Sequence, residues 1–132
     1  MEILIKRIND DAKLPAYKQE VGPGIELYAF GEVIIEPGEK VLVSTGIAIA
    51  MPVGYVGLVW NQNNMILDQD IRVTATIIDS GYRDEVKVEL FNAGTENRTI
   101  ADAEVVAQLL VQSVSHARLI EAEDLSGFDT AD

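Results

Sequence analysis

Short apolar runs alternate with polar residues along most of the chain, and the pattern is clearest over residues 73–92. Within Val86–Leu90 every second side chain is apolar, with Lys87 and Glu89 between them. A period of two residues is typical of a strand that buries one face. Because Asp79-Ser80-Gly81 interrupts the apolar positions, residues 73–92 are predicted to form two strands joined by a turn.

Comparable runs recur on both sides of this stretch, separated by turn sequences rich in glycine and proline. The expected strands cover residues 2–8, 25–29, 33–35, 41–43, 46–50, 55–60, 105–111 and 113–120. Many short strands with turns at steady spacing predict an all-β fold, a single-domain β-sandwich or jelly roll. Residues 61–70 interrupt the series, because the amides at 61–64 need partners that a core seldom supplies. A short helix or turn is expected at 65–67.

The length and the composition indicate one folded unit with a tail. A chain of 132 residues suits one domain, and 48% of its residues are hydrophobic. The last stretch, from Glu121 on, is acidic and has too few apolar residues to fold alone. We therefore expect a β domain over residues 1–120 and an acidic C-terminal arm over residues 121–132.

The composition and the net charge limit the kinds of ligand and partner that we expect. Ten basic and 22 acidic residues give a net charge of −12, which argues against a nucleic-acid surface, since such surfaces depend on basic groups. The chain has no cysteine, and its single histidine, His116, argues against a histidine-rich metal site. No apolar run is long enough to span a membrane, and the N-terminus lacks the layout of a signal peptide. We expect a cytoplasmic protein.

Asp79 is the first candidate for chemistry. It directly follows Ile77 and Ile78, which both look buried, and Tyr82 comes three residues later. A carboxylate fixed at the end of an apolar strand is a candidate general base, because partial burial tunes its pKa. Aspartate before Ser-Gly is also common in turns, so a purely structural role is the competing interpretation.

The run from Ile78 to Val88, IDSGYRDEVKV, resembles the third motif of the trimeric dUTPase family, I-D-x-x-Y-R-G-E-[VI]-x-V. The resemblance extends over nearly the whole chain and implies the β-clip fold of that family. It also implies that Asp79 activates the attacking water and that Tyr82 packs under the deoxyribose. The main chain around Thr76, Ile77 and Ile78 would then bind the uracil edge.

Two further stretches resemble family motifs near the sugar and the water. Gly24–Ala29 resembles G-[YF]-D-L-Y-A, with Glu26 in place of the aspartate. Ala103–Leu109 resembles G-D-[RK]-[IV]-A-Q-L, and the resemblance assigns Gln108 to placing the catalytic water. The structural alternatives are an exposed strand acid for Glu26 and a buried strand amide with an ordinary partner for Gln108.

The motifs that the family uses at the phosphates are altered. Gln62, Asn63 and Asn64 stand where the family has Arg-Ser-Gly or Arg-Ser-Ser, and an amide donates weaker hydrogen bonds to phosphate than arginine does. A polar loop without a ligand is the alternative there. In the arm, Gly127–Thr130 resembles part of the glycine-rich fifth motif, which makes Phe128 the candidate to stack on the base. The acidic residues around it oppose phosphate binding.

By this resemblance the protein is a dUTP diphosphatase that converts dUTP to dUMP and pyrophosphate. The resemblance implies a homotrimer with sites between subunits, a deoxyuridine nucleotide as ligand, and Mg²⁺ held through the triphosphate without a separate protein metal site. The altered phosphate motifs leave a second hypothesis, a non-catalytic trimer of the same fold that serves as a binding or scaffold protein or as the partner of an active paralogue. A third hypothesis is a relative of the dCTP deaminases, which residues 78–82 and 88–92 also resemble and in which a glutamate near the position of Glu89 transfers the proton.

Overall fold

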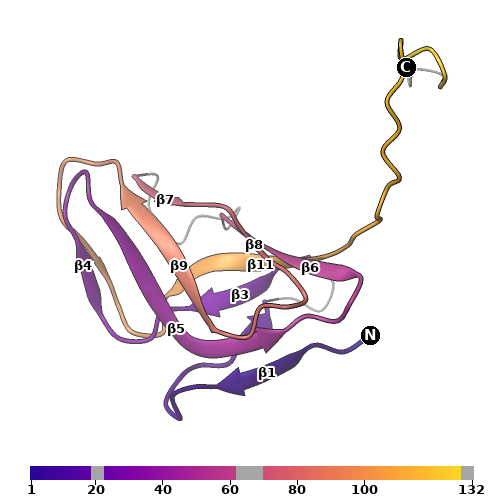
Figure 1. Ribbon diagram of the computed structural model, residues 1–132. Helices are drawn as coiled ribbons and strands as arrows, with labels where there is room; N and C mark the ends of the chain where they lie inside the picture. Colours follow the sequence, from indigo (N-terminus) through magenta and orange to yellow (C-terminus); the bar gives the residue numbers. More distant parts are fainter. Residues whose placement is uncertain (19–22, 62–69, 129–132) are drawn as a thin grey trace.

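The computed structural model describes residues 1–18, 23–61 and 70–128, which form an all-β domain followed by an extended C-terminal segment (Figure 1). The strands in these residues are β1 (Leu4–Arg7), β2 (Ala16–Tyr17), β3 (Ile25–Tyr28), β4 (Val33–Ile35), β5 (Lys40–Ala50), β6 (Tyr55–Trp60), β7 (Ile71–Val73), β8 (Thr76–Ile78), β9 (Glu85–Asn92), β10 (Arg98–Ile100) and β11 (Val105–Ser113). The described residues include no helix that is long and apolar enough to cross a membrane.

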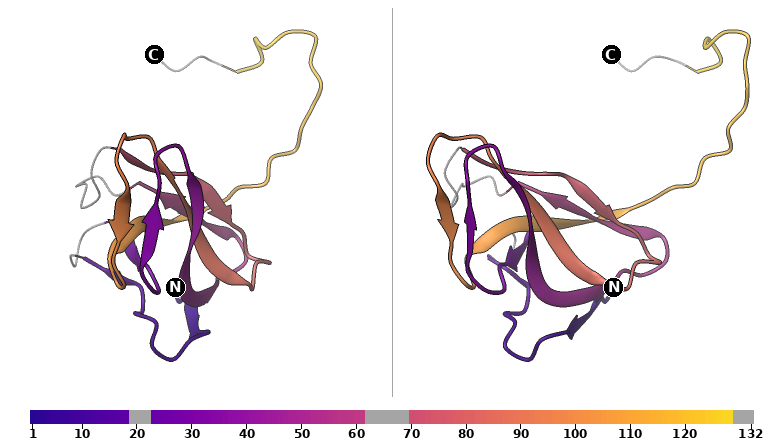
Figure 2. Two further views of the ribbon diagram at one scale, coloured as in Figure 1. Left: turned by 90° about the vertical axis from the view of Figure 1, so that its left-hand side faces the viewer. Right: turned by 60° about the vertical axis from the view of Figure 1, so that its left-hand side comes forward.

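The strands pair in antiparallel sheets with the core between them. One sheet has the order β1-β5-β9-β7, a second has the order β2-β3-β11-β6-β8, and β10 pairs with β4. The ribbon views show the strands arranged as a sandwich (Figures 1 and 2). The fully buried side chains include Ile47, Ile49, Val88 and Leu90 from the first sheet and Leu27, Val59 and Leu109 from the second. The predicted all-β sandwich is confirmed.

The two strands expected at 41–43 and 46–50 are one strand, β5. Its pairing with β9 shifts register between Ser44 and Ala48. Gly46 lies in this irregular part with a φ of +72°, a conformation that glycine adopts without strain. The bulge bends the strand without ending it, which explains why the sequence there looks like a break.

The stretch 73–92 does contain strands joined by a turn, but β8 and β9 are not paired with each other. β8 pairs with β6 at the edge of the five-stranded sheet, whereas β9 lies between β5 and β7 in the other sheet. The turn at 79–84 therefore connects the two layers of the sandwich. A period of two residues identifies strands but not their partners, so this crossing is not visible in the sequence.

The strand expected at 113–120 is not formed. β11 pairs with β6 up to Ser113 opposite Tyr55, where β6 begins. One further main-chain hydrogen bond follows, from the Val114 amide to the Gly54 carbonyl at 2.9 Å, and no strand of the described residues lies alongside the chain after it. The buried character predicted for 105–111 is confirmed for its first part, since Val106–Leu109 is buried. Residues 114–128 extend away from the sandwich in all three views of Figures 1 and 2.

Candidate functional site

The first group of candidate residues lies at the end of β8. Because β8 is an edge strand, only one side of its main chain is paired within the sheet. Ile78 is 3% exposed and faces the core, whereas Ile77 is 66% exposed, so the expectation that both isoleucines are buried is wrong for Ile77. Thr76, Ile77 and Ile78 thus present a free strand edge next to the turn that carries Asp79 and Tyr82.

Asp79 is exposed and shapes the turn that follows it. Its Oδ1 accepts a hydrogen bond from the Gly81 amide at 2.9 Å, and its carbonyl accepts one from the Tyr82 amide at 3.2 Å. Asp79 is therefore a turn residue, as the structural interpretation predicts. This role leaves Oδ2 without a hydrogen-bond partner among the described residues, so the carboxylate keeps an oxygen directed at solvent.

The same turn holds the tyrosine and is fixed by local hydrogen bonds. The Tyr82 hydroxyl donates to the Glu85 carbonyl at 2.7 Å, and Arg83 donates to the carbonyls of Ser80 and Tyr82. These contacts hold the Tyr82 ring, which is 36% exposed, beside β8. The cavity there measures about 60 Å³ and is lined by residues of β6, β8 and β9. That volume is far below the few hundred Å³ of a typical ligand site, so one chain does not enclose a nucleotide.

The second group lies on β3 and β11. Glu26 and Gln108 are direct cross-strand neighbours, and each is 8% exposed. The Tyr28 hydroxyl donates to Glu26 Oε1 at 3.1 Å, as expected for residues two apart on one strand face. We call Glu26, Tyr28 and Gln108 the β3–β11 cluster. The burial of Glu26 contradicts the interpretation of this residue as an exposed strand acid.

Gln108 is held from two sides. Its Nε2 donates to the Asn61 carbonyl at 2.7 Å. On the other side a Cβ added to Gly24 would lie 2.0 Å from Gln108 Oε1, so the amide keeps this position only because residue 24 is glycine. Asn61 is itself tied to β7, because its Oδ1 accepts a hydrogen bond from the Val73 amide at 3.1 Å. Gln108 has the ordinary partner that a buried amide requires.

The surroundings of Tyr28 alter its acidity. Burial, followed by the hydrogen bond to Glu26, raises the pKa of Tyr28 from 10.0 to about 12. The hydroxyl therefore stays protonated at neutral pH and remains a donor to the carboxylate. The Lys13 ammonium lies over the ring of Tyr28, 4.0 Å from its centroid, which adds a cation to the edge of the cluster.

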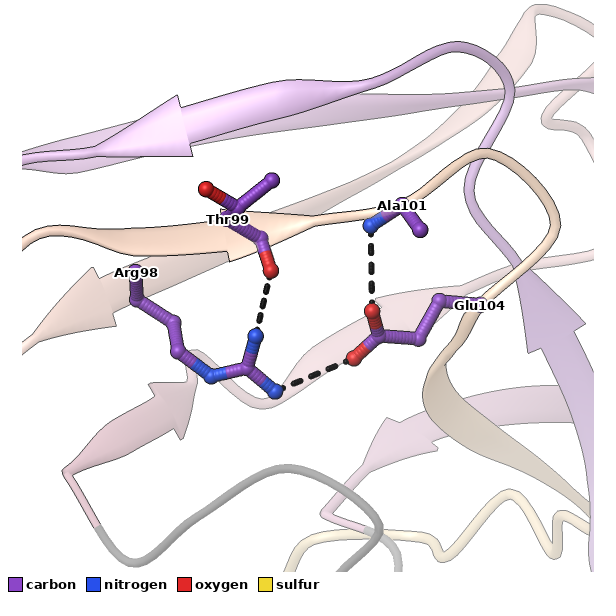
Figure 3. A network of polar contacts seen from close by, with 4 residues as sticks. All are labelled: Arg98, Thr99, Ala101 and Glu104. Atoms are coloured by element: carbon purple, nitrogen blue, oxygen red, sulfur yellow. Dashed lines mark hydrogen bonds and ion pairs between the residues drawn. The ribbon is translucent and has the colours of Figure 1, made fainter.

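The turn before β11 fixes the start of the strand that carries Gln108 (Figure 3). Glu104 accepts a hydrogen bond from the Ala101 amide at 3.0 Å and forms an ion pair with Arg98 at 3.2 Å. Arg98 also donates to the Thr99 carbonyl. Ala103 has a φ of 66° at the position where the resembled motif has glycine.

The two groups are well separated within one chain. Ile78 lies opposite Gly57, which lies opposite Val111, so Asp79 is level with Gln112, four residues along β11 from Gln108. At ordinary strand dimensions this offset is about 13 Å along the strands and about 10 Å across them. Asp79 and Gln108 of the same chain therefore do not share a water molecule, and the expectation that they do is wrong for one chain.

The remaining candidates lie elsewhere. Phe128 is 91% exposed on the extended segment, away from both groups (Figure 1). Gln62, Asn63 and Asn64, like the short helix or turn expected at 65–67, lie outside the described residues. Among the described residues, no group of three or more histidine, cysteine, aspartate or glutamate side chains is arranged to hold a metal ion.

Comparison with known proteins shows which family the chain belongs to. A family model described as dUTPase matches residues 10–132. The deoxyuridine 5'-triphosphate nucleotidohydrolase of Nautilia profundicola is 37% identical over 128 residues, which cover 96% of this chain and 90% of the relative. This chain belongs to the dUTPase family. The corresponding protein of Corynebacterium diphtheriae is 39% identical over 94% of this chain and 84% of its own length.

Solved dUTPases share the fold. A Staphylococcus bacteriophage 80alpha dUTPase with dUpNHpp has a TM-score of 0.88 and 19% identity, and the match covers 97% of this chain and 92% of the phage protein. The dUTPase of phage phi11 of S. aureus has a TM-score of 0.88 and 18% identity, over 97% of this chain and all of the other. At this identity the likeness establishes the fold, which agrees with the dUTPase family assignment.

Two residues of the candidate site lie outside the motifs: Lys13 and Asn61. Tyr28 belongs to the Gly24–Ala29 motif, and its spacing from Glu26 is a usable signal, because residues two apart on a strand share a face. The contacts of Lys13 and Asn61 come from segments distant in the sequence, and no local pattern in this dUTPase family chain indicates them.

Proposed function

We propose that this protein hydrolyses dUTP to dUMP and pyrophosphate, as a homotrimer and with Mg²⁺ held through the triphosphate. The observation that carries the proposal is the family match over residues 10–132, with relatives of nearly equal length that are deoxyuridine 5'-triphosphate nucleotidohydrolases. A cytoplasmic location and an acidic arm over residues 121–132 that covers a neighbouring subunit's site belong to the same proposal.

The β8 edge and the turn after it supply the nucleoside end of the proposed site. The free main-chain groups of Thr76–Ile78 offer donors and acceptors to the uracil edge, and the fixed ring of Tyr82 offers an apolar surface to the deoxyribose. Asp79 takes a proton from water as that water attacks the α-phosphorus. The new bond joins the water oxygen to this phosphorus, the bond to the α,β-bridging oxygen breaks, and pyrophosphate leaves with the bonding electron pair.

A complete site requires a second chain in this proposal. The register separates Asp79 from Gln108, so one chain supplies Asp79 and Tyr82 and a neighbour supplies the β3–β11 cluster. The outer face of the five-stranded sheet offers a contact surface, with Trp60 at 49% and Ile77 at 66% exposure. The C-terminal segment after β11 adds Leu119 and Phe128, both 91% exposed, which further supports association between chains.

The described donors fit a nucleotide-held Mg²⁺ better than a protein-only metal cage. Mg²⁺ commonly binds through one or two carboxylates and substrate phosphates and keeps several waters. Glu26 is the carboxylate of the β3–β11 cluster that would hold it, directly or through water, together with the triphosphate. When bound, the ion offsets phosphate charge in a chain of −12.

Neither alternative hypothesis gains support. No contact or relative favours a non-catalytic trimer, and the relatives with high identity bear the hydrolase name. Glu89, the candidate proton-transfer residue of a deaminase-like site, lies on β9 opposite Leu42 in the four-stranded sheet, away from the turn that holds Asp79. The hydrolase reading is therefore the one we propose.

The test is incubation of the purified protein with Mg²⁺ and each deoxynucleoside triphosphate in turn, with pyrophosphate release and base deamination followed separately. We expect pyrophosphate from dUTP and little from dTTP, dCTP, dATP or dGTP. Removal of Mg²⁺ with a chelator should lower the dUTP rate strongly. No pyrophosphate from dUTP, or uracil formation from dCTP, would overturn the proposal.

A further inference from the structure

We infer that Lys13 binds the triphosphate of the nucleotide and supplies a positive charge at the β3–β11 cluster. The inference rests on the proposed function and deepens it, because it names a phosphate-binding residue outside the motifs that the sequence singles out. Lys13 belongs to the loop between β1 and β2, a segment to which the sequence motifs assign no role.

The position of Lys13 is defined by a ring contact. Its Nζ lies 4.0 Å from the centroid of the Tyr28 ring, close enough for a cation–π interaction. In residues 1–18, 23–61 and 70–128 Lys13 forms no ion pair, and its side chain is exposed. The ammonium therefore keeps its donors available for a ligand, while the ring limits where the flexible side chain lies.

The ring connects Lys13 to the buried carboxylate. The Tyr28 hydroxyl donates to Glu26 Oε1 at 3.1 Å, so one phenol ring and one hydrogen bond separate the ammonium from Glu26. Glu26 lies directly opposite Gln108 on the next strand. Lys13, Glu26 and Gln108 thus flank one side of the sheet, with Lys13 at its solvent edge.

The negative charge of the chain and of the ligand explains why a cation is needed at the β3–β11 cluster. A triphosphate that approaches Glu26 meets a carboxylate on a chain of −12, and Mg²⁺ neutralises only part of the ligand charge. Residues 62–64 contribute amides and no charge. Three described arginines are engaged elsewhere: Arg7 with the Ala12 carbonyl, Arg83 with its own turn and Arg98 with Glu104.

The chemistry of Lys13 suits the phosphates better than the nucleoside. An ammonium binds the charged oxygens of a triphosphate strongly, whereas the nucleoside candidates are main-chain groups of β8 and the Tyr82 ring on the chain that supplies Asp79. Removal of Lys13 should therefore weaken ligands in proportion to their phosphate charge and leave the nucleoside contribution unchanged.

Calorimetry of Lys13→Ala, Lys13→Arg and Lys40→Ala tests the inference. Lys40→Ala is the matched control, because it removes the same charge from the start of β5 in the other sheet. The ligands are dUpNHpp with Mg²⁺ and dUMP. We expect Lys13→Ala to weaken dUpNHpp about tenfold, dUMP by less than about threefold, and Lys13→Arg to retain most of the affinity. The loss should shrink as salt rises.

The experiment distinguishes failure of the inference about Lys13 from failure of the proposed function. If wild-type protein binds dUpNHpp and Lys13→Ala matches Lys40→Ala, the inference about Lys13 is wrong while the proposed function stands. Equal weakening of dUpNHpp and dUMP would also overturn it, because that result indicates a purely structural role for the contact with Tyr28. If wild-type protein does not bind dUpNHpp, the proposed function fails and the inference fails with it. Urea unfolding midpoints of the variants show that each is folded during the titration.

Discussion

Ala103 occupies a left-handed backbone conformation that L-residues with a Cβ adopt at a cost. Its φ of 66° makes it the one non-glycine residue with positive φ in the described part of the chain. The turn is nevertheless well fixed, because Ala103 donates to the Ala29 carbonyl at 2.8 Å and Glu104 ties the turn to Arg98. The surrounding contacts therefore hold a conformation that the residue itself disfavours.

We expect Ala103→Gly to stabilise the protein by up to about 1 kcal/mol, because glycine removes the strain of positive φ, with a partial offset from the greater freedom of the unfolded chain. Urea unfolding of both proteins measures the difference. Asp84→Gly is the matched control, since Asp84 also stands where the resembled motif has glycine but does not have a positive φ. It should destabilise or leave stability unchanged. A less stable Ala103→Gly variant would contradict this account.

Tyr28 makes a second residue-scale prediction, on pH. Its pKa is raised to about 12 in the folded protein from 10.0, through burial and the hydrogen bond to Glu26. A raised pKa contributes stability that is complete below pH 10 and is lost as the pH rises toward 12. The stability advantage of wild type over Tyr28→Phe should therefore shrink by about 1 kcal/mol per pH unit above the unfolded pKa.

The measurement is urea unfolding of both proteins at neutral pH and at several values above 10. Comparison of the two proteins at each pH isolates the contribution of Tyr28. At neutral pH wild type should be more stable by about 1 kcal/mol, since Phe leaves Glu26 without this donor. A stability difference between the two proteins that stays constant across this pH range would show that the pKa of Tyr28 is not raised in the folded protein.

At the scale of elements, the missing side chain of Gly24 leaves room for the Gln108 amide on the neighbouring strand. A Cβ on Gly24 would lie 2.0 Å from Gln108 Oε1. The obstructed atom is the end of a flexible side chain, so Gly24→Ala should move the amide and weaken its hydrogen bond to the Asn61 carbonyl, with only a modest loss of stability. We expect hydrolysis of dUTP to fall about tenfold while the fold is retained.

A control for this variant is Gly38→Ala, in the turn before β5, where an added Cβ meets no atom within 4 Å. Its positive φ of 78° makes alanine unfavourable, so stability should fall while Gln108 keeps its position and activity is retained. Activity close to wild type in Gly24→Ala would show that the exact position of Gln108 is unimportant. The readout should include KM as well as kcat, because displacement of the Gln108 amide and general loss of folded protein would affect the two differently.

The same elements show what a sequence predicts. Strands with a clear period, such as Tyr55–Trp60 and Val86–Leu90, are found where the pattern places them. β2 and β10 are too short to produce a pattern, and the expected strand at 113–120 has no partner strand among the described residues after Val114. Pairing is a non-local property, which is why the separation of β8 and β9 into different sheets escapes a local analysis.

In the candidate site, too, local features can be predicted from the sequence, whereas distances between residues cannot. The alternation in β3 and β11 correctly places Glu26 and Gln108 on strands, and the structure makes them neighbours. Their distance from Asp79 depends on the order β3-β11-β6-β8, which no motif states. Burial is also decided by the whole sandwich, so Ile77 and Ile78, adjacent and alike in sequence, differ in exposure from 66% to 3%.

At the scale of the whole molecule, the separation of the two residue groups leads to a test of the assembly. Within one chain, Asp79 and Gln108 are separated by two strand spacings across the sheet and are offset by four residues along the strand direction. If the active site is composite, two inactive variants can repair each other. We expect Asp79→Asn trimers to lack activity because the general base is lost, and Gln108→Leu trimers to be strongly impaired.

Chains of the two variants, unfolded together in equal amounts and refolded, should form mixed trimers. A site that takes Asp79 from one chain and Gln108 from a neighbour then has both residues intact in roughly a quarter of all cases, so about a quarter of wild-type activity should return. Variants refolded separately and then mixed without exchange are the control and should stay inactive. Sedimentation of the refolded mixture should give the mass of three chains. Absence of recovery in trimers of that mass would mean that each site takes both residues from one chain, which the strand register forbids without rearrangement of β6 and β8.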